Sequence, residues 1–353
     1  MAHSAEQWAD VAKGIGRAAR GAYPRLFEAD SIPPELWTEM ADAGLLGLAT
    51  PAEFGGAGLT TAEIGPIARA FAYGAGVQGL VTTWQSHNLL SDWIFSRFAT
   101  PDQQAKWRPE IAAGRVSCAF AVSEPGAGAH PKRLSASAAP DGDGFRLNGQ
   151  KAYVTNGPIA AVFAIVVVAD MDAGGRKRFA SFLVPRDAPG LTVHASEHVN
   201  FLKPCGHASL TLENVFVPAT DRLGGDDDIY PTMVAPLRDH EDSAGAWARL
   251  GAYERLAAAF KPIDPVTAGG LAARMRAVER LLIDDPTDAG TLSARIVLED
   301  ARRAMEAAVA AHPNQLGDAD AALAHDLAKL GDVARYAIDA RFRRLGLSLE
   351  DCA

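Results

Sequence analysis

Cysteine is scarce in this sequence, and no motif surrounds the few that occur. The 353 residues include three cysteines, Cys118, Cys205 and Cys352, which lie far apart in the chain. Their spacing fits neither a zinc site nor a CxxC redox motif, and three cannot pair completely into disulfides. We therefore expect a protein of the reducing cytoplasm. The scattered histidines, such as His87, His194 and His240, are expected to be packing or surface residues and not metal ligands.

Basic runs and long apolar segments are lacking as well. The 34 Lys and Arg stand against 43 Asp and Glu, a net charge of −9, and no Lys/Arg-rich run is present. This balance argues against a nucleic-acid partner. The longest apolar run, residues 160–169, is about half of the roughly 20 residues that a membrane helix needs. Residues 1–14 lack the apolar core of a secretory signal. We expect no membrane span.

The sequence divides into three regions with different patterns. Residues 1–115 carry apolar side chains at helical spacing and predict an N-terminal helical domain. Residues 116–225 carry short runs of Val, Ile, Phe and Thr between turn residues, which predicts a middle β domain with a hairpin element at 145–151. Residues 226–353 are Ala-rich and predict a C-terminal four-helix bundle, so the fold class is α+β multi-domain. The expected bundle helices are 236–260, 267–284, 287–311 and 319–345.

A strand-like run at Cys118–Val122 breaks into the turn Ser-Glu-Pro-Gly-Ala-Gly-Ala. A plain loop, a phosphate cradle and a platform for a flat ligand are the alternatives. The glycines do not form a G-x-G-x-x-G motif, and Pro131 interrupts any helix that could direct its N-terminus at a pyrophosphate. Taken alone, this segment favours a surface turn.

A second segment of the β region, Lys151–Pro158, changes that interpretation. It offers an aromatic ring and a hydroxyl, Tyr153 and Thr155, as the first segment does with Phe120 and Ser123. Stacking on a flat heteroaromatic ring adds about 1 kcal/mol beyond burial. Hydroxyls and bare backbone N–H groups satisfy ring oxygens and nitrogens, and glycine lets the backbone come close. Together the two segments predict a site for a flat ring.

Four stretches together resemble the acyl-CoA dehydrogenase family of flavoproteins. They occur in family order and at family spacing over about residues 30–225. They are Trp37–Gly58 with GLLGLATPAEFGGAG, Phe98–Gly128 with SEPGAG, Asn148–Gly157 with NGQKAYVTNG, and Gly206–Gly224. The resemblance implies the family fold and FAD bound against the β domain and the C-terminal bundle. It further implies an acyl-CoA or acyl-carrier thioester as substrate and a separate electron-transfer acceptor.

The resemblance also assigns flavin contacts to residues 120–129 and 153–155. Ser123 keeps a hydroxyl where the family usually has Thr, Tyr153 replaces the usual stacked Trp, and Thr155 keeps the hydroxyl near flavin N5. Core packing is the alternative for Tyr153. Ala129-His130 stands where the family usually has Ser-Asp, so one positioning hydroxyl is missing. The implied cofactor-binding residues are Phe120, Val122, Ser123, Gly128, Ala129, Tyr153, Val154 and Thr155.

Family chemistry requires a carboxylate base, which takes a proton from the carbon beside the thioester once desolvation has raised its pKa. The common family position precedes a Gly-Thr pair near the C-terminus, and residues 349–353 have no such pair. Glu241 matches the minority position on the first bundle helix. On a helical wheel it shares a stripe with Leu237 and small residues, Ala244, Ala248 and Gly251.

The alternative for Glu241 is a solvated carboxylate at a helix start, which the neighbouring Asp239 and Asp242 favour. Other family features of the bundle are missing. Ala257 stands where the family has an Arg that reaches a neighbouring subunit's FAD, Lys261 follows Phe260 in place of Gly, and the later Gln and Gly-Gly-x-Gly element is absent. The adenosine half of the FAD site is therefore weak, remodelled or completed by a different chain.

Three functions remain open from the sequence. The first is an FAD-dependent acyl-thioester dehydrogenase, with Glu241 as its catalytic base. The second is a non-catalytic or half-site subunit of a heteromer, because the bundle motifs are missing. The third is a flavin monooxygenase or oxidase on the same fold, which would not need Glu241. We expect a homodimer or homotetramer, with a heteromer as the alternative.

Overall fold

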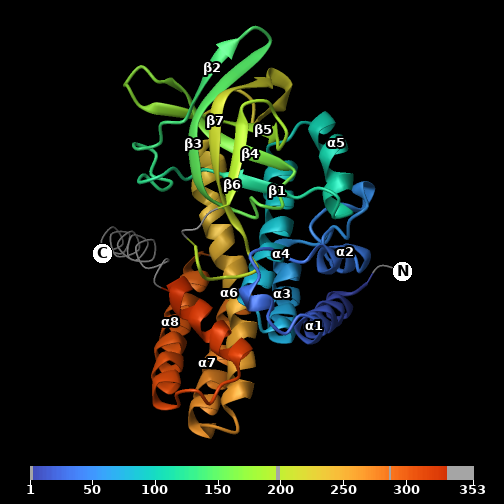
Figure 1. The fold of residues 1–353 in the computed structure, drawn as a ribbon, viewed down its shortest axis with the longest axis vertical. Coiled ribbons are helices and arrows are strands. Elements are labelled where there is room, and N and C mark those ends of the chain that lie inside the picture. Colours follow the sequence, from blue (N-terminus) through green and yellow to red (C-terminus); the bar gives the residue numbers. More distant parts are fainter. Residues whose placement is uncertain (1–2, 196–198, 286–287, 332–353) are drawn as a thin grey trace.

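The computed structural model describes residues 3–195, 199–285 and 288–331. Figure 1 shows a twisted β sheet at one end of the molecule, the N-terminal helices along one side, and the C-terminal helices at the other end. The long helix α6 (Ala235–Phe260) runs from the sheet into the helical half. The predicted fold class, with helical, β and helical regions in that order, is confirmed.

The N-terminal region is helical, as predicted. Three of its helices begin at capping boxes, at Ser4–Gln7, Thr60–Glu63 and Thr100–Gln103. The predicted helix over 77–98 is helical to Ser96, but its last turn, Ser91–Ser96, is wider than an α-helix. The helices are α1 (Ala5–Ala22), α2 (Pro34–Asp42), α3 (Thr61–Ala75), α4 (Gln78–Leu90) and α5 (Pro101–Ala112).

The middle region forms one eight-stranded sheet of order β6-β7-β3-β2-β4-β5-β8, with β1 paired parallel to β4. Its inward side chains form a separate apolar core. The strands are β1 (Cys118–Ala121), β2 (Ser137–Asp141), β3 (Gly144–Thr155), β4 (Val162–Met171), β5 (Lys177–Pro185), β6 (Leu191–Ala195), β7 (His207–Pro218) and β8 (Arg222–Leu223).

The hairpin element expected at 145–151 is wrong in one respect. Residues 145–151 lie inside the single strand β3, and the tight turn precedes them at Gly142-Asp143, where Asp141 pairs with Gly144. Gly149 instead marks a break in the β3–β7 register and has a φ of 136°. A glycine in a strand pattern therefore indicated a bulge here, not a turn.

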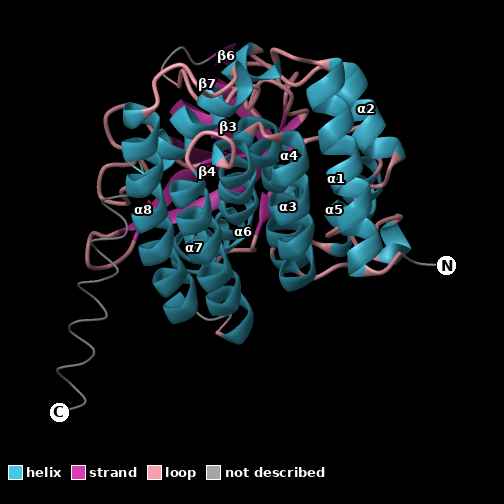
Figure 2. Ribbon diagram, turned by 90° about the horizontal axis from the view of Figure 1, so that it is seen from below, coloured by secondary structure: helices cyan, strands magenta, loops and turns pink. Residues whose placement is uncertain are grey.

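The C-terminal helices α6, α7 (Pro265–Asp284) and α8 (Asp288–Ala311) confirm the first three predicted segments. A fourth helical segment begins at residue 318 and is described to residue 331. The rest of the predicted fourth helix, Cys352 and the terminal residues 349–353 lie outside the described residues. Figure 2 shows α8, α7, α6, α3 and α1 side by side in front of the strands, and these helices share one hydrophobic core.

Two glycines allow α3 and α6 to pack closely. A Cβ on Gly65 would lie 2.6 Å from the indole nitrogen of Trp247, and a Cβ on Gly251 would lie 2.0 Å from the carbonyl oxygen of Arg69. Any larger side chain would push the helices apart. This contact fixes α6 against the N-terminal helices and thereby places its first turns under the sheet.

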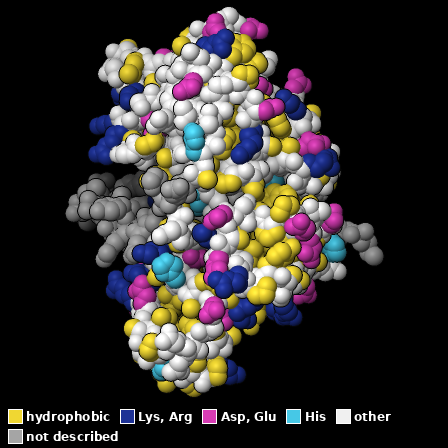
Figure 3. Space-filling model, in the orientation of Figure 1, with side chains coloured by type: hydrophobic (Ala, Val, Ile, Leu, Met, Phe, Trp, Pro, Cys, Tyr) yellow, Lys and Arg dark blue, Asp and Glu magenta, His cyan; other side chains and the backbone are white. Residues whose placement is uncertain are grey.

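Two surface features bear on the expected partners. Within the described ranges, no helix combines the length and apolar character that crossing a membrane requires. Figure 3 shows acidic and basic side chains interspersed over the visible face, so the net charge of −9 is not gathered into one patch there.

Candidate functional site

A cavity of about 550 Å³ lies where the sheet meets α4 and the start of α6. Residues from four parts of the chain line it: α4, the segment from β1 to Pro131, the end of β3, and the chain from Tyr230 into α6. Its volume falls within the roughly 300–1,000 Å³ of typical ligand sites.

Most of the predicted site residues line this one cavity. They are Phe120, Val122, Ser123, Ala129, Tyr153, Thr155 and Glu241. Two predicted residues do not line it. Val154 is 1% exposed and packs into the core of the sheet. Gly128, with a φ of 58°, closes a tight turn by exchanging two backbone hydrogen bonds of 3.0 Å with Glu124.

The two glycine-and-hydroxyl segments lie directly side by side. The backbone N–H of Ala152 donates to the carbonyl oxygen of Ser123 at 2.8 Å. The Nζ of Lys151 donates to the carbonyl oxygen of Val122 at 3.1 Å and to Oε1 of Glu124 at 2.9 Å. The predicted meeting of these segments is therefore a feature of the structure.

The buried ion pair between Glu124 and Lys151 was not predicted from the sequence. Glu124 also accepts hydrogen bonds from the backbone N–H groups of Ser135 and Ala136 and from the Ser135 hydroxyl. Burial opposes its charge, but the Lys151 ammonium and these donors hold the pKa of Glu124 below its usual value. The pair could have been predicted because both motifs carry a charged residue within or next to a strand-like run. A charge buried in such a place needs a partner of opposite charge.

Tyr153 presents its ring outside the protein core. The side chain is 49% exposed, which excludes the core-packing alternative, and it lines the cavity. Its backbone has a φ of 58°, in the left-handed region that an aromatic residue rarely adopts. Such strain persists only when the surrounding structure enforces it, and it concentrates at functional sites.

Two hydroxyls of the cavity wall have no hydrogen-bond partner among the described residues. They belong to Ser123 and Thr155, and both line the cavity beside the rings of Phe120 and Tyr153. Unsatisfied hydroxyls beside aromatic rings fit a flat ligand with ring oxygens and nitrogens. The residues present therefore fit an isoalloxazine ring.

Glu241 is the acidic residue of α6 that lines this cavity. Its side chain keeps exposed surface because it faces the open cavity, while protein surrounds it on the other sides. Desolvation by that protein, opposed by the Arg238 charge and reinforced by Asp242, raises the pKa of Glu241 to about 7. Asp242 itself pairs with Arg295 in the bundle.

Sequence reasoning missed two further cavity residues on the segment before Glu241. The hydroxyl of Tyr230 donates to the carbonyl oxygen of Ala129 at 2.7 Å and fixes the loop there. Arg238 lines the cavity and makes no hydrogen bond or ion pair with the described residues. Neither residue belongs to a sequence motif, so only their position in the fold identifies them as cavity residues.

The histidines behave as the sequence predicted. Burial lowers the pKa of His87 to about 4, and its Nε2 contacts the carbonyl oxygens of Leu46 and Ile111. His240 packs against the ring of Trp93 at 4.3 Å. No group of three metal-ligating side chains occurs within the part of the chain that the structure describes.

Family models match most of the N-terminal and middle regions. The acyl-CoA dehydrogenase N-terminal domain matches residues 13–115, and the middle domain of the same family matches residues 119–215. Together these matches cover more than half of the chain.

Curated relatives agree with the family models. Acyl-CoA dehydrogenase FadE12 of Mycobacterium tuberculosis is 30% identical over 217 residues, which are 62% of this chain and 55% of that protein. L-prolyl-[peptidyl-carrier protein] dehydrogenase of Pseudomonas fluorescens is 31% identical over 189 residues, 53% of this chain and 50% of that protein. The chain thus matches only about half the length of these relatives.

Solved structures extend the likeness in fold to the bundle. Butyryl-CoA dehydrogenase from Megasphaera elsdenii has a TM-score of 0.81 at 19% identity and covers 93% of each chain. PigA in its apo form has a TM-score of 0.81 at 20% identity, over 98% of this chain and 99% of that one. From the matched domains and the shared architecture, the chain belongs to the acyl-CoA dehydrogenase family.

Proposed function

We propose that the cavity holds the flavin of FAD and that the protein oxidises an acyl thioester to its α,β-unsaturated form. One observation carries the proposal: Glu241, with a pKa raised to about 7, lines the same cavity as the Phe120–Ser123 and Tyr153–Thr155 segments. FAD, when bound, supplies the acceptor for the hydride that leaves the β carbon. The Glu241 carboxylate takes the α proton, so two electrons and two hydrogens leave the substrate.

The wall residues have distinct roles in this proposal. The Tyr153 and Phe120 rings orient the flat ring, and the Ser123 and Thr155 hydroxyls bond its polar edge. The Glu124–Lys151 pair holds both wall segments in register. The carrier of the thioester stays a prediction, either CoA or a carrier protein, as do the electron acceptor, the oligomeric state and the cytoplasmic location.

The packing of α4 against α6 behind Leu89 supports a short acyl group as substrate. The Gln85 side-chain amide donates to the carbonyl oxygen of Ala244 at 2.8 Å and so bridges α4 and α6 one turn beyond Glu241. A separate space of about 20 Å³, beside Asn88 and Asp92, shares Leu89 with the cavity. That is room for about one water molecule. We expect the Gln85–Ala244 hydrogen bond to keep a long alkyl chain out of this space.

The visible spectrum of purified protein tests the function. We expect a yellow protein whose flavin absorbance bleaches anaerobically on addition of a short acyl-CoA. Glu241→Gln should stay yellow and fail to bleach, because it binds the flavin but has no base. Asp239→Asn is the matched control, since Asp239 lies on the same helix but lines a different cavity, and it should bleach normally.

Three results would contradict the proposal. Bleaching by Glu241→Gln at the wild-type rate would remove the base assignment. A colourless protein that acquires flavin only with a second chain would identify a half-site subunit. Oxygen consumption by reduced flavin, without thioester turnover, would identify an oxidase or monooxygenase.

A further inference from the structure

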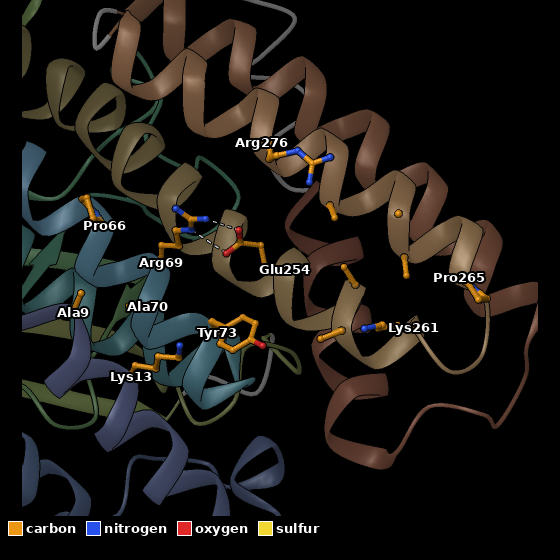
Figure 4. A pocket seen from close by; sticks show the side chains of 15 residues that line it. Ala9, Lys13, Pro66, Arg69, Ala70, Tyr73, Glu254, Lys261, Pro265 and Arg276 are labelled. Atoms are coloured by element: carbon orange, nitrogen blue, oxygen red, sulfur yellow. Dashed lines mark hydrogen bonds and ion pairs between the residues drawn. The ribbon is translucent and has the colours of Figure 1, made fainter. Parts of the chain in front are cut away.

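A second cavity, of about 830 Å³, lies between α1, α3, α6 and α7 in the helical half of the molecule. It is far from the catalytic cavity. Ala258, on its wall, follows Glu241 by 17 residues of continuous helix, which is about 26 Å along the axis. Figure 4 shows its lining side chains rising from these four helices. Nothing in the proposed reaction uses this cavity.

The floor of this second cavity consists of small apolar residues. On α6 and α7 it is formed by Ala257, Ala258, Ala268, Gly269 and Ala272. These residues leave a channel along the contact between the two helices, because none has a side chain long enough to fill it. A ligand in this channel would contact almost only carbon.

Its polar groups are mostly cations. Arg69 is neutralised by Glu254 and Glu279 through close ion pairs. Lys261 and Arg276 line the cavity without a hydrogen bond or ion pair to the described residues. The Lys13 ammonium lies 5.2 Å from the centre of the Tyr73 ring, and Figure 4 shows Lys13 and Lys261 on opposite sides of that ring. Positive charge is thus in excess here, on a chain whose net charge is −9.

We propose that this cavity binds a single-chain amphipathic anion of the fatty-acid class. The carboxylate would lie among Lys13, Lys261 and the Tyr73 hydroxyl, and the alkyl chain would follow the α6–α7 alanines. The Arg69–Glu254 pair stands between the α3 side and the α6 side of the cavity (Figure 4). It interrupts the apolar strip that a partner helix would need, whereas a flexible chain can pass beside it.

Calorimetric titration with dodecanoate, below its micelle concentration, tests the proposal on the full chain. We expect saturable one-site binding and a raised melting temperature. Dodecyltrimethylammonium has the same chain length and the opposite charge, and it should not bind. The double change Lys13→Glu with Lys261→Glu should weaken dodecanoate at least tenfold. Arg280→Glu, on α7 and outside the lining, should not.

Two tryptophan variants test where the alkyl chain of the ligand lies. Ala272→Trp fills the floor of the cavity and should abolish binding, while Ala273→Trp, the next residue and exposed, should not. Ser86→Trp fills the catalytic cavity instead. It should leave dodecanoate binding intact, so failure here is separable from failure of the proposed function.

Each contrary outcome overturns the proposal. Absence of saturable binding would do so, as would equal binding by Ala272→Trp and Ala273→Trp. Loss of binding in Ser86→Trp would place the ligand in the catalytic cavity. A fall in molar mass by light scattering in Ala272→Trp alone would show that a second copy of the chain covers this surface. If Ala272→Trp fails to fold, the charge variants decide.

Discussion

The Nζ of Lys151 lies 2.9 Å from Oε1 of Glu124, and the two side chains are 0% and 5% exposed. This buried ion pair joins β3 to the turn after β1, which are 27 positions apart in the sequence. Because Ser123 precedes Glu124 and Tyr153 and Thr155 follow Lys151, the pair sets the distance between the two walls of the catalytic cavity.

Lys151→Met should strongly destabilise the protein. The change leaves the Glu124 carboxylate buried beside a thioether, and breaking a buried pair on one side costs about 3–5 kcal/mol. Urea denaturation measures the free energy of unfolding. Replacing both partners, as in Glu124→Leu with Lys151→Met, should recover much of the lost stability, since no unpaired charge remains.

The exposed pair of Arg146 and Asp141 is the control, and Arg146→Met should cost only about 0–1 kcal/mol. Equal losses for Lys151→Met and Arg146→Met would contradict this account.

Replacing Tyr153 by glycine should relieve backbone strain, but loss of the ring should weaken flavin binding. Its φ of 58° suits glycine, so Tyr153→Gly should be more stable than Tyr153→Ala by about 1 kcal/mol. Both variants lose the ring and should bind FAD less tightly, whereas Tyr153→Phe keeps it and should bind nearly as well as wild type. Flavin fluorescence quenching measures the affinity. Unchanged affinity in Tyr153→Gly would remove the stacking role.

The lining of the candidate site could be predicted from sequence only in part. Two β segments that each offer an aromatic ring and a hydroxyl predict that Ser123 and Thr155 lie together, and both do line one cavity. The family resemblance implies Val154 as a further flavin contact. Alternation along a strand turns it to the opposite face, where it packs in the sheet core. Gly128 closes the tight turn with Glu124. A glycine-rich segment is expected both for a tight turn and for close contact with a ligand, so the sequence cannot separate these two roles.

Contacts between distant residues account for what was missed. The sequence gives no register between Glu124 and Lys151, nor between Tyr230 and Ala129, because their meeting depends on the assembled sheet and helices. The cavity at Lys261 depends likewise on how closely α3 and α6 approach, which Gly65 and Gly251 determine. Helix periodicity predicted the helices but not the spaces left between them.

Gln85 should limit the length of the acyl group. Its amide donates to the carbonyl oxygen of Ala244 beside the small space that shares Leu89 with the cavity, so Gln85→Gly should let longer chains enter that space. We expect the ratio of octanoyl to butyryl thioester affinity to rise about tenfold, which corresponds to roughly 1.4 kcal/mol. Thermal shifts with non-reacting acyl analogues measure this without turnover. Thr82→Gly, one turn earlier on α4, is the control, because Thr82 borders neither the cavity nor the small space that Gln85 lines. Equal affinity of the wild type for both chain lengths would exclude a barrier at Gln85.

Glu241 should give the reaction its dependence on pH. Desolvation, opposed by Arg238, raises its pKa to about 7, and only the carboxylate form accepts a proton. The rate of anaerobic flavin bleaching should therefore rise with pH through a midpoint near 7. Arg238→Gln removes a positive charge that favours the carboxylate, so its midpoint should lie higher.

Folding stability should reveal the same group independently of turnover. Because the folded pKa of Glu241 is raised above its ordinary value near 4.5, its contribution to stability is fully present below that value and is lost as pH rises through about 7. Glu241→Gln does not titrate, so the stability difference between variant and wild type should change over this pH window and be constant above it. Asp239→Asn, on the same helix, controls for the other carboxylates of the chain. A difference that stays constant from pH 4 to pH 8 would mean that Glu241 titrates as an ordinary solvated carboxylate, and the base would then have to be sought elsewhere.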